Sequence, residues 1–128
     1  MNKVAGRELD ALVAEKVMGW TVHWASPPEL CPPGASYWRD GRQVVFALPY
    51  YSIDIAAAWK VVEGLPSAFW PEVGRMDDGR WYCEIVGRGD TPADVSPGPI
   101  ARVVAHTAPH AICLAALHAV AVVSGLPA

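Results

Sequence analysis

The residues with the clearest chemical potential form an aromatic turn, Pro49-Tyr50-Tyr51-Ser52, directly before a predicted helix. The first N–H groups of a helix have no partners within it and attract anions. Aromatic rings stack on nucleobases. The turn is therefore a candidate docking site for a small nucleotide. Alternatively, Ser52 only caps the helix, the tyrosines pack at a sheet edge, and Asp54 already supplies negative charge there.

Arginines gather around two predicted hairpins and would form a phosphate-binding patch if the hairpins adjoin. They are Arg39, Arg42, Arg75, Arg80 and Arg88. Alternatively, they are solvated turn charges interleaved with Asp40, Asp77 and Asp78. Together with the aromatic turn, this gives the candidate ligand-binding residues Tyr50, Tyr51, Ser52, Arg39, Arg42, Arg88 and Trp38.

His106, His110 and Cys113 have a spacing that would direct them to one metal ion on a continuous helix. His106 precedes the predicted helix, however, and no carboxylate lies nearby in sequence. We therefore expect a polar edge on an apolar helix, with no metal site and no cofactor. The sequence contains no GxSxG, HExxH, P-loop or paired-carboxylate motif, so we expect no catalytic residues and no enzymatic activity.

Six tryptophans are many for a chain of 128 residues. Trp59 and Trp81 fit core positions of a predicted helix and a predicted strand. Trp24, Trp38 and Trp70 lie near loops or strand ends, where they line a pocket, form an oligomer interface or simply pack.

The composition predicts one domain with one core, because 52% of the 128 residues are hydrophobic. The net charge of −3 argues against general nucleic-acid binding.

The longest apolar run, residues 111–123, is broken by His118 and is shorter than the roughly 20 residues of a membrane span. Three widely spaced cysteines and an N-terminus without an apolar signal indicate reduced thiols in the cytoplasm.

The first half of the chain predicts a helix, a short strand and a hairpin. Apolar residues at helical spacing place a helix over residues 7–18, and a strand follows at 21–24. The proline-dense stretch 25–35 is an extended loop. The hairpin pairs residues 36–39 with the apolar strand 43–48 around Asp40-Gly41.

The second half predicts a helix, a hairpin, a strand and a last helix. The helix begins after Ser52, ends near Glu63 and buries a stripe of Ile55, Trp59 and Val62. The hairpin pairs residues 68–73 with 80–86, and a loop covers 87–99. A strand at 100–104 precedes a buried helix that begins near Thr107.

This order predicts an α+β fold, a three-layer α/β/α sandwich whose mainly antiparallel sheet carries helices on both faces. Three segments, LDALVAEKVMGW (9–20), LPYYSIDIAAAWKVV (48–62) and TAPHAICLAAL (107–117), resemble the phage ABA-sandwich domain family. The resemblance covers nearly the whole chain. It implies the same layered architecture and a small protein encoded by a bacteriophage or prophage.

The resemblance and the aromatic turn together suggest a counter-defence factor. Such a factor would bind and sequester a nucleotide-type immune second messenger, such as a cyclic nucleotide or a cyclic ADP-ribose, as a homo-oligomer away from membranes. The alternative is an interaction or structural protein that binds a host or phage protein and no small ligand.

Overall fold

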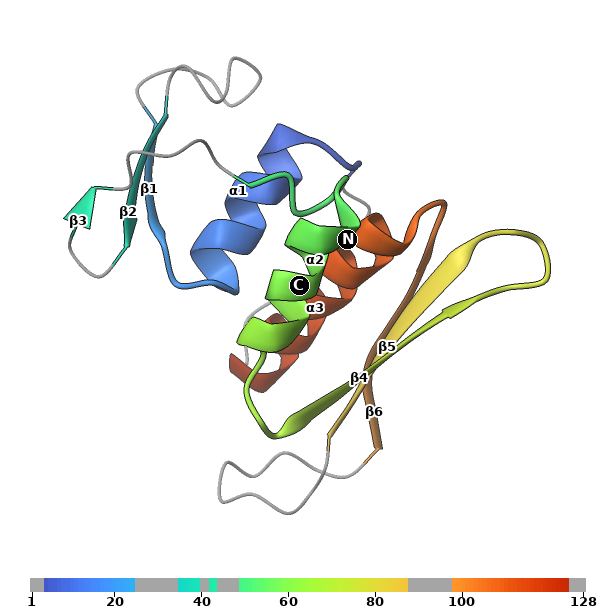
Figure 1. The fold of residues 1–128 in the computed structure, drawn as a ribbon. Coiled ribbons are helices and arrows are strands. Elements are labelled where there is room, and N and C mark those ends of the chain that lie inside the picture. The colour runs from blue at the N-terminus through green and yellow to red at the C-terminus, as the bar shows by residue number, and fades with distance from the viewer. Residues whose placement is uncertain (1–3, 25–34, 40–41, 44–48, 88–97, 125–128) are drawn as a thin grey trace.

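The computed structural model describes residues 4–24, 35–39, 42–43, 49–87 and 98–124. Within these ranges the chain forms three helices, α1 (Arg7–Lys16), α2 (Ile55–Gly64) and α3 (Ala108–Ser124). It also forms two antiparallel sheets (Figure 1). The first consists of β1 (Thr21–Trp24), β2 (Ala35–Arg39) and β3 (Arg42–Gln43), and the second of β4 (Phe69–Arg75), β5 (Trp81–Gly87) and β6 (Gly98–Ala105). The predicted α+β class is confirmed.

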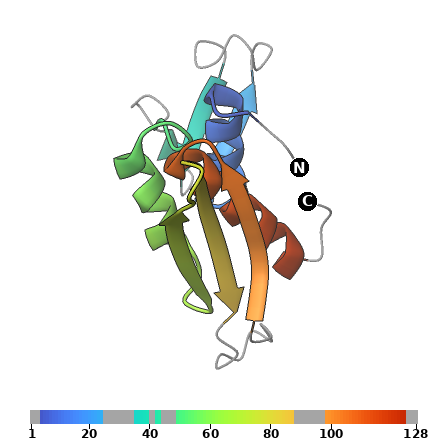
Figure 2. The same ribbon diagram turned by 90° about the vertical axis from the view of Figure 1, so that its right-hand side faces the viewer.

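Helix α3 is the central element of the core. It packs against all three strands of the second sheet and against both other helices. Ile112, Ala115, Ala116 and Ala119 are fully or almost fully buried, as the apolar sequence of this helix predicts. Its many alanines allow neighbouring elements to approach closely. In Figure 2 the second sheet faces the viewer and the helices lie behind it.

The second sheet is a three-stranded antiparallel meander in the order β4-β5-β6. Its first hairpin runs from Phe69 opposite Gly87 to Arg75 opposite Trp81, which confirms the predicted pairing. Cys83 and Ile85 are buried against the helices, as expected for alternate residues of a strand with one covered face.

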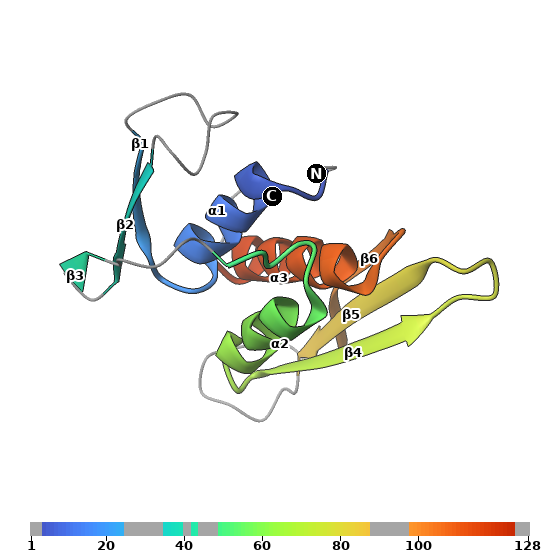
Figure 3. The same ribbon diagram turned by 45° about the horizontal axis from the view of Figure 1, so that its top comes forward.

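The layers differ from a simple sandwich. Helices α2 and α3 lie on one side of the second sheet, α1 lies beyond α3, and β1–β3 lie beyond α1 (Figure 3). Helices on both faces of one sheet are therefore not confirmed by the described residues. The predictions for residues 25–34, 44–48 and 88–97 lie outside these ranges. No helix within them is both long and apolar enough to cross a membrane.

The buried side of α2 was predicted wrongly at two of its three residues, since Val62 is partly buried against the core but Ile55 and Trp59 are not. Ile55 and Trp59 are 51% and 50% exposed, while Ala58 and Val61 are completely buried. Both stripes repeat at helical spacing, but α2 packs against the alanine-rich surface of α3. A close approach between two helices favours small side chains, so the larger residues of α2 face outward. Trp59 is consequently a surface residue.

The outer face of the second sheet depends on the absence of a side chain at Gly74. A Cβ at this position would lie 2.5 Å from Cε1 of Tyr82. The Tyr82 ring is held there because its hydroxyl donates to Glu72 (3.1 Å) and the Arg102 guanidinium lies 4.8 Å from its centroid. The ring therefore lies flat across β4.

We predict that Gly74→Ala lowers the free energy of unfolding by about 1–2 kcal/mol, because the Tyr82 ring must leave its place. Replacing a glycine inside a strand by alanine usually raises the free energy of unfolding. A decrease in Gly74→Ala would therefore indicate the contact with Tyr82. Urea denaturation of Gly74→Ala, Tyr82→Ala and the double variant measures the effect. In the Tyr82→Ala background the penalty should vanish, and an equal penalty in both backgrounds would contradict the contact.

Candidate functional site

The aromatic turn before α2 is anchored by a carboxylate of α1. The backbone N–H of Ser52 donates to Asp10 Oδ1 at 2.8 Å, and the Ser52 hydroxyl lies 2.6 Å from the same oxygen. Both residues are completely buried. Because a buried carboxylate is costly unless it is paired and hydrogen-bonded, these contacts fix the turn against α1.

The second oxygen of Asp10 and the start of α1 complete this network. Asp10 Oδ2 accepts from the Arg7 guanidinium at 2.8 Å. The Gly6 N–H donates to the Ser52 hydroxyl at 2.9 Å, and Gly6 has a φ of 148°, which L side chains rarely adopt. Arg7 also reaches the Pro49 carbonyl at 3.4 Å. The chain before α1 and the turn before α2 are thus joined at several points.

Tyr50 is the accessible member of the aromatic pair. Its side chain is 53% exposed, and the Arg7 guanidinium lies 4.1 Å from the centre of its ring. The Tyr50 carbonyl accepts from the N–H groups of Ile53 (3.1 Å) and Asp54 (2.8 Å). The ring is therefore presented from a rigid turn and is suited to stacking with a planar group.

Two parts of the predicted turn site have structural roles instead. Tyr51 is only 3% exposed and packs in the core, and the hydroxyl of Ser52 is used by Asp10 and Gly6. The N-cap of α2 is Asp54, not Ser52, and its carboxylate accepts from Ala56 N at 3.2 Å. A carboxylate already occupies this helix end, so it is a poor site for an anion.

The remaining candidates are only partly described. Trp38 and Arg39 lie in β2, where Arg39 pairs with Arg42 of β3, but their side chains lie outside the described part. Arg88 lies outside it altogether. In the other hairpin, Arg80 forms a salt bridge with Asp78 at 2.7 Å, which matches the alternative of turn charges paired with aspartates.

Arg7 and Asp10 were not predicted to support the turn. Asp10 lies between Leu9 and Val13 on a face of α1 whose other members are buried apolar residues. A carboxylate on a buried face of a helix requires a partner, so the position of Asp10 in the sequence already indicates a buried polar contact. Its partner Ser52 is 42 residues away, so the pairing itself is not visible in the sequence.

Neither a metal centre nor a reactive thiol is found among the described residues. His106 is exposed whereas Cys113 is completely buried, and no group of three or more His, Cys, Asp or Glu side chains is suitably placed in these ranges. Burial raises the pKa of Cys83 to about 12. Burial, and next the Asp10 carboxylate, raises the pKa of Cys113 still further. Thiolate chemistry is therefore suppressed at both positions.

We predict that Asp10→Ala lowers the free energy of unfolding by about 3 kcal/mol, because it removes the partner of Arg7 and of a buried N–H. Chemical denaturation measures the change. Glu63→Ala, which removes an exposed carboxylate of α2, is the matched control and should stay within about 0.5 kcal/mol. Equal small effects of both changes would contradict an anchoring role for Asp10.

The raised pKa values also predict how the thiols react. In a Cys31→Ser variant at pH 8, Cys83 and Cys113 should remain unlabelled by a thiol reagent while the protein is folded, because little thiolate forms below a raised pKa. In urea both should react at the rate of free cysteine. Rapid labelling of the folded variant would contradict their burial.

Comparison with known proteins agrees with this architecture. The family described as Phage ABA sandwich domain matches residues 11–117, from within α1 to within α3. The crystal structure of a phage protein from Bacillus cereus ATCC 14579 is similar, with a TM-score of 0.67 and 27% sequence identity. The similarity covers 93% of this chain and 95% of that chain. No curated protein matches the sequence. The chain belongs to the Phage ABA sandwich domain family and is a small phage-type protein.

Proposed function

We propose that this protein is a non-enzymatic counter-defence factor that binds and sequesters a nucleotide-type immune second messenger. Its phage family supplies the biological setting. The observation that carries the proposal is the exposed Tyr50 ring, with the Arg7 guanidinium stacked on it at 4.1 Å. A cyclic nucleotide or a cyclic ADP-ribose offers a planar base to such a surface.

Stacking on the Tyr50 ring would supply part of the binding free energy, about 1–3 kcal/mol for one base on an aromatic ring. The Arg7 guanidinium already lies over this ring in the free protein, so their contact holds the ring in place and adds no free energy on binding. The Asp10–Ser52 contacts hold the turn before the ligand arrives, so little conformational entropy is lost on binding. The Arg7–Asp10 pair has no net charge, so the surface favours stacking over attraction of phosphate.

The surface beside Tyr50 supports the proposed homo-oligomer and also a second candidate function. Ile53, Ile55 and Trp59 are 57%, 51% and 50% exposed on and just before α2. Clusters of exposed apolar side chains mark protein interaction sites. The second candidate is therefore a protein that binds a host or phage protein through α2, with no small ligand.

Thermal unfolding with a panel of cyclic di- and trinucleotides and cyclic ADP-ribose isomers separates these candidates. A ligand at a hundred times its Kd stabilises the folded state by about 2.7 kcal/mol, a shift of several degrees. Tyr50→Ala should weaken binding by roughly tenfold or more and change the Tm of the free protein little, since its ring is exposed.

Two variants serve as controls for this experiment. Tyr50→Phe keeps the stacking surface and should bind normally. Trp70→Ala removes an aromatic side chain that is 59% exposed on β4 and should also bind normally. No shift with any compound, or equal binding by Tyr50→Ala, would contradict the proposed site. The first of these results would favour a protein partner at α2, for which Trp59→Ser is the corresponding variant.

A further inference from the structure

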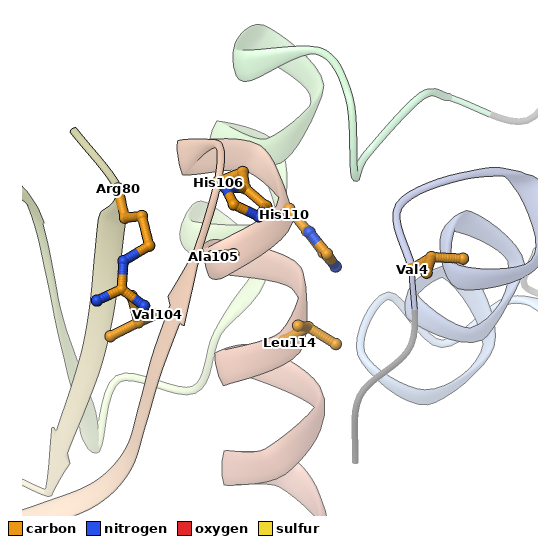
Figure 4. A pocket seen from close by; sticks show the side chains of 7 residues that line it. All are labelled: Val4, Arg80, Val104, Ala105, His106, His110 and Leu114. Carbon is orange, nitrogen blue, oxygen red and sulfur yellow. The ribbon is translucent and has the colours of Figure 1, made fainter. Parts of the chain in front are cut away.

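A pocket of about 360 Å³, whose lining does not include Tyr50, lies at the N-terminal end of α3 (Figure 4). It is bordered by the end of β6, by Arg80 before β5, and by the segment that precedes α1. Its polar lining consists of His106, His110 and Arg80; in Figure 4 the two histidines lie on one side of the end of β6, and Arg80 and Val104 lie on the other. Val4 and Leu114 provide an apolar side.

The polar lining of this pocket is basic. Arg80, His106 and His110 come from two different parts of the chain, and no carboxylate is among the described lining residues. Asp78 engages the Nε of Arg80 at 2.7 Å, and a guanidinium has further N–H donors on its two other nitrogens. An imidazole and a guanidinium together can donate several charge-assisted hydrogen bonds to one oxyanion.

The amides of His110 and Ala111 at the start of α3 are already used, so the polar groups facing this pocket are side chains. The His110 N–H donates to the Thr107 hydroxyl at 3.3 Å, the Ala111 N–H donates to the Thr107 carbonyl at 3.1 Å, and Pro109 has no N–H. These bonds cap α3 and fix the backbone on which His110 is carried. His106 is exposed and His110 is half-buried, so both lie where a solute can reach the pocket.

We propose that this pocket binds a phosphate group, either free or as a phosphomonoester whose non-polar part lies against Val4 and Leu114. The basic side chains take the oxyanion, and the apolar side distinguishes an ester from the free ion. A metal ion fits less well, because the lining offers two imidazoles, no carboxylate, and a guanidinium that repels a cation. The inference does not depend on the proposed function at Tyr50.

The test uses the whole protein at pH 6. Inorganic phosphate and phenyl phosphate are titrated at constant ionic strength, and the imidazole ring signals are followed by NMR. We expect the His106 and His110 signals to shift together with saturation, and phenyl phosphate to bind several-fold more tightly than phosphate. His118, which is absent from the lining, should not shift.

Variants assign the site and separate it from the Tyr50 surface. His106→Gln and Arg80→Gln should each weaken phenyl phosphate binding by roughly tenfold, since each replaces a basic side chain with a neutral amide. His118→Gln changes a histidine of α3 that is absent from the lining; it is the control and should bind like the wild type. Tyr50→Ala should also bind phenyl phosphate normally, so failure here is distinct from failure of the nucleotide proposal.

Three results would overturn the inference. The first is unchanged affinity in His106→Gln and Arg80→Gln. The second is a linear, unsaturated shift of all histidine signals, which indicates a general salt effect. The third is saturable binding of Zn²⁺ to His106 and His110 without any effect of phosphate, which would make the pocket a metal site.

Discussion

The buried carboxylate of Asp10 is the constraint on which the position of the aromatic turn depends. It accepts hydrogen bonds from the backbone of Ser52 and from Arg7, and it lies within hydrogen-bonding distance of the Ser52 hydroxyl. Removing a carboxylate from water is unfavourable by several kcal/mol, and only such a complete set of partners offsets this cost. The position of the turn before α2 is consequently tied to α1, and both elements are tied to α3 through the core.

One network therefore orients two different surfaces. Fixing Ser52 turns the neighbouring Tyr51 into the core and leaves Tyr50 outside, beneath the guanidinium of Arg7. The same serine holds Gly6, and two residues before Gly6 the chain reaches Val4 at the rim of the histidine pocket. The network thus organises the aromatic surface through Arg7 and Ser52, and it holds the segment that carries Val4 at the rim of the basic pocket.

The sequence correctly predicts those elements whose apolar pattern is compatible with only one buried face or one strand pairing. Helix α3 is apolar nearly throughout and must be buried, and the hairpin of β4 and β5 combines alternation with a clear turn. Helix α2 has two possible apolar stripes. If the largest apolar side chains are assumed to be buried, the buried face contains Ile55 and Trp59. In the structure α2 packs against the alanines of α3, and the buried face contains Ala58 and Val61 instead. The choice is made by a neighbouring helix, so the pattern of α2 alone cannot reveal it.

The candidate site shows the same limit. The aromatic turn is visible in the sequence, but which of its two tyrosines is accessible is not. Its support by Arg7 and Asp10 is not visible, because it joins residues about 42 positions apart. The histidine pocket likewise needs the end of β6 beside Arg80 and the first residues of the chain, which only the folded structure brings together.

The chemical state of a ligand after binding tests the sequestration account most directly. Protein saturated with the compound that stabilises it most is washed and denatured by heat, and the released compound is analysed by mass spectrometry. Sequestration predicts recovery of the compound with unchanged mass, in an amount that matches the binding sites. A hydrolysed or rearranged product would show an enzyme and contradict the account, as would a washed protein that retains no compound.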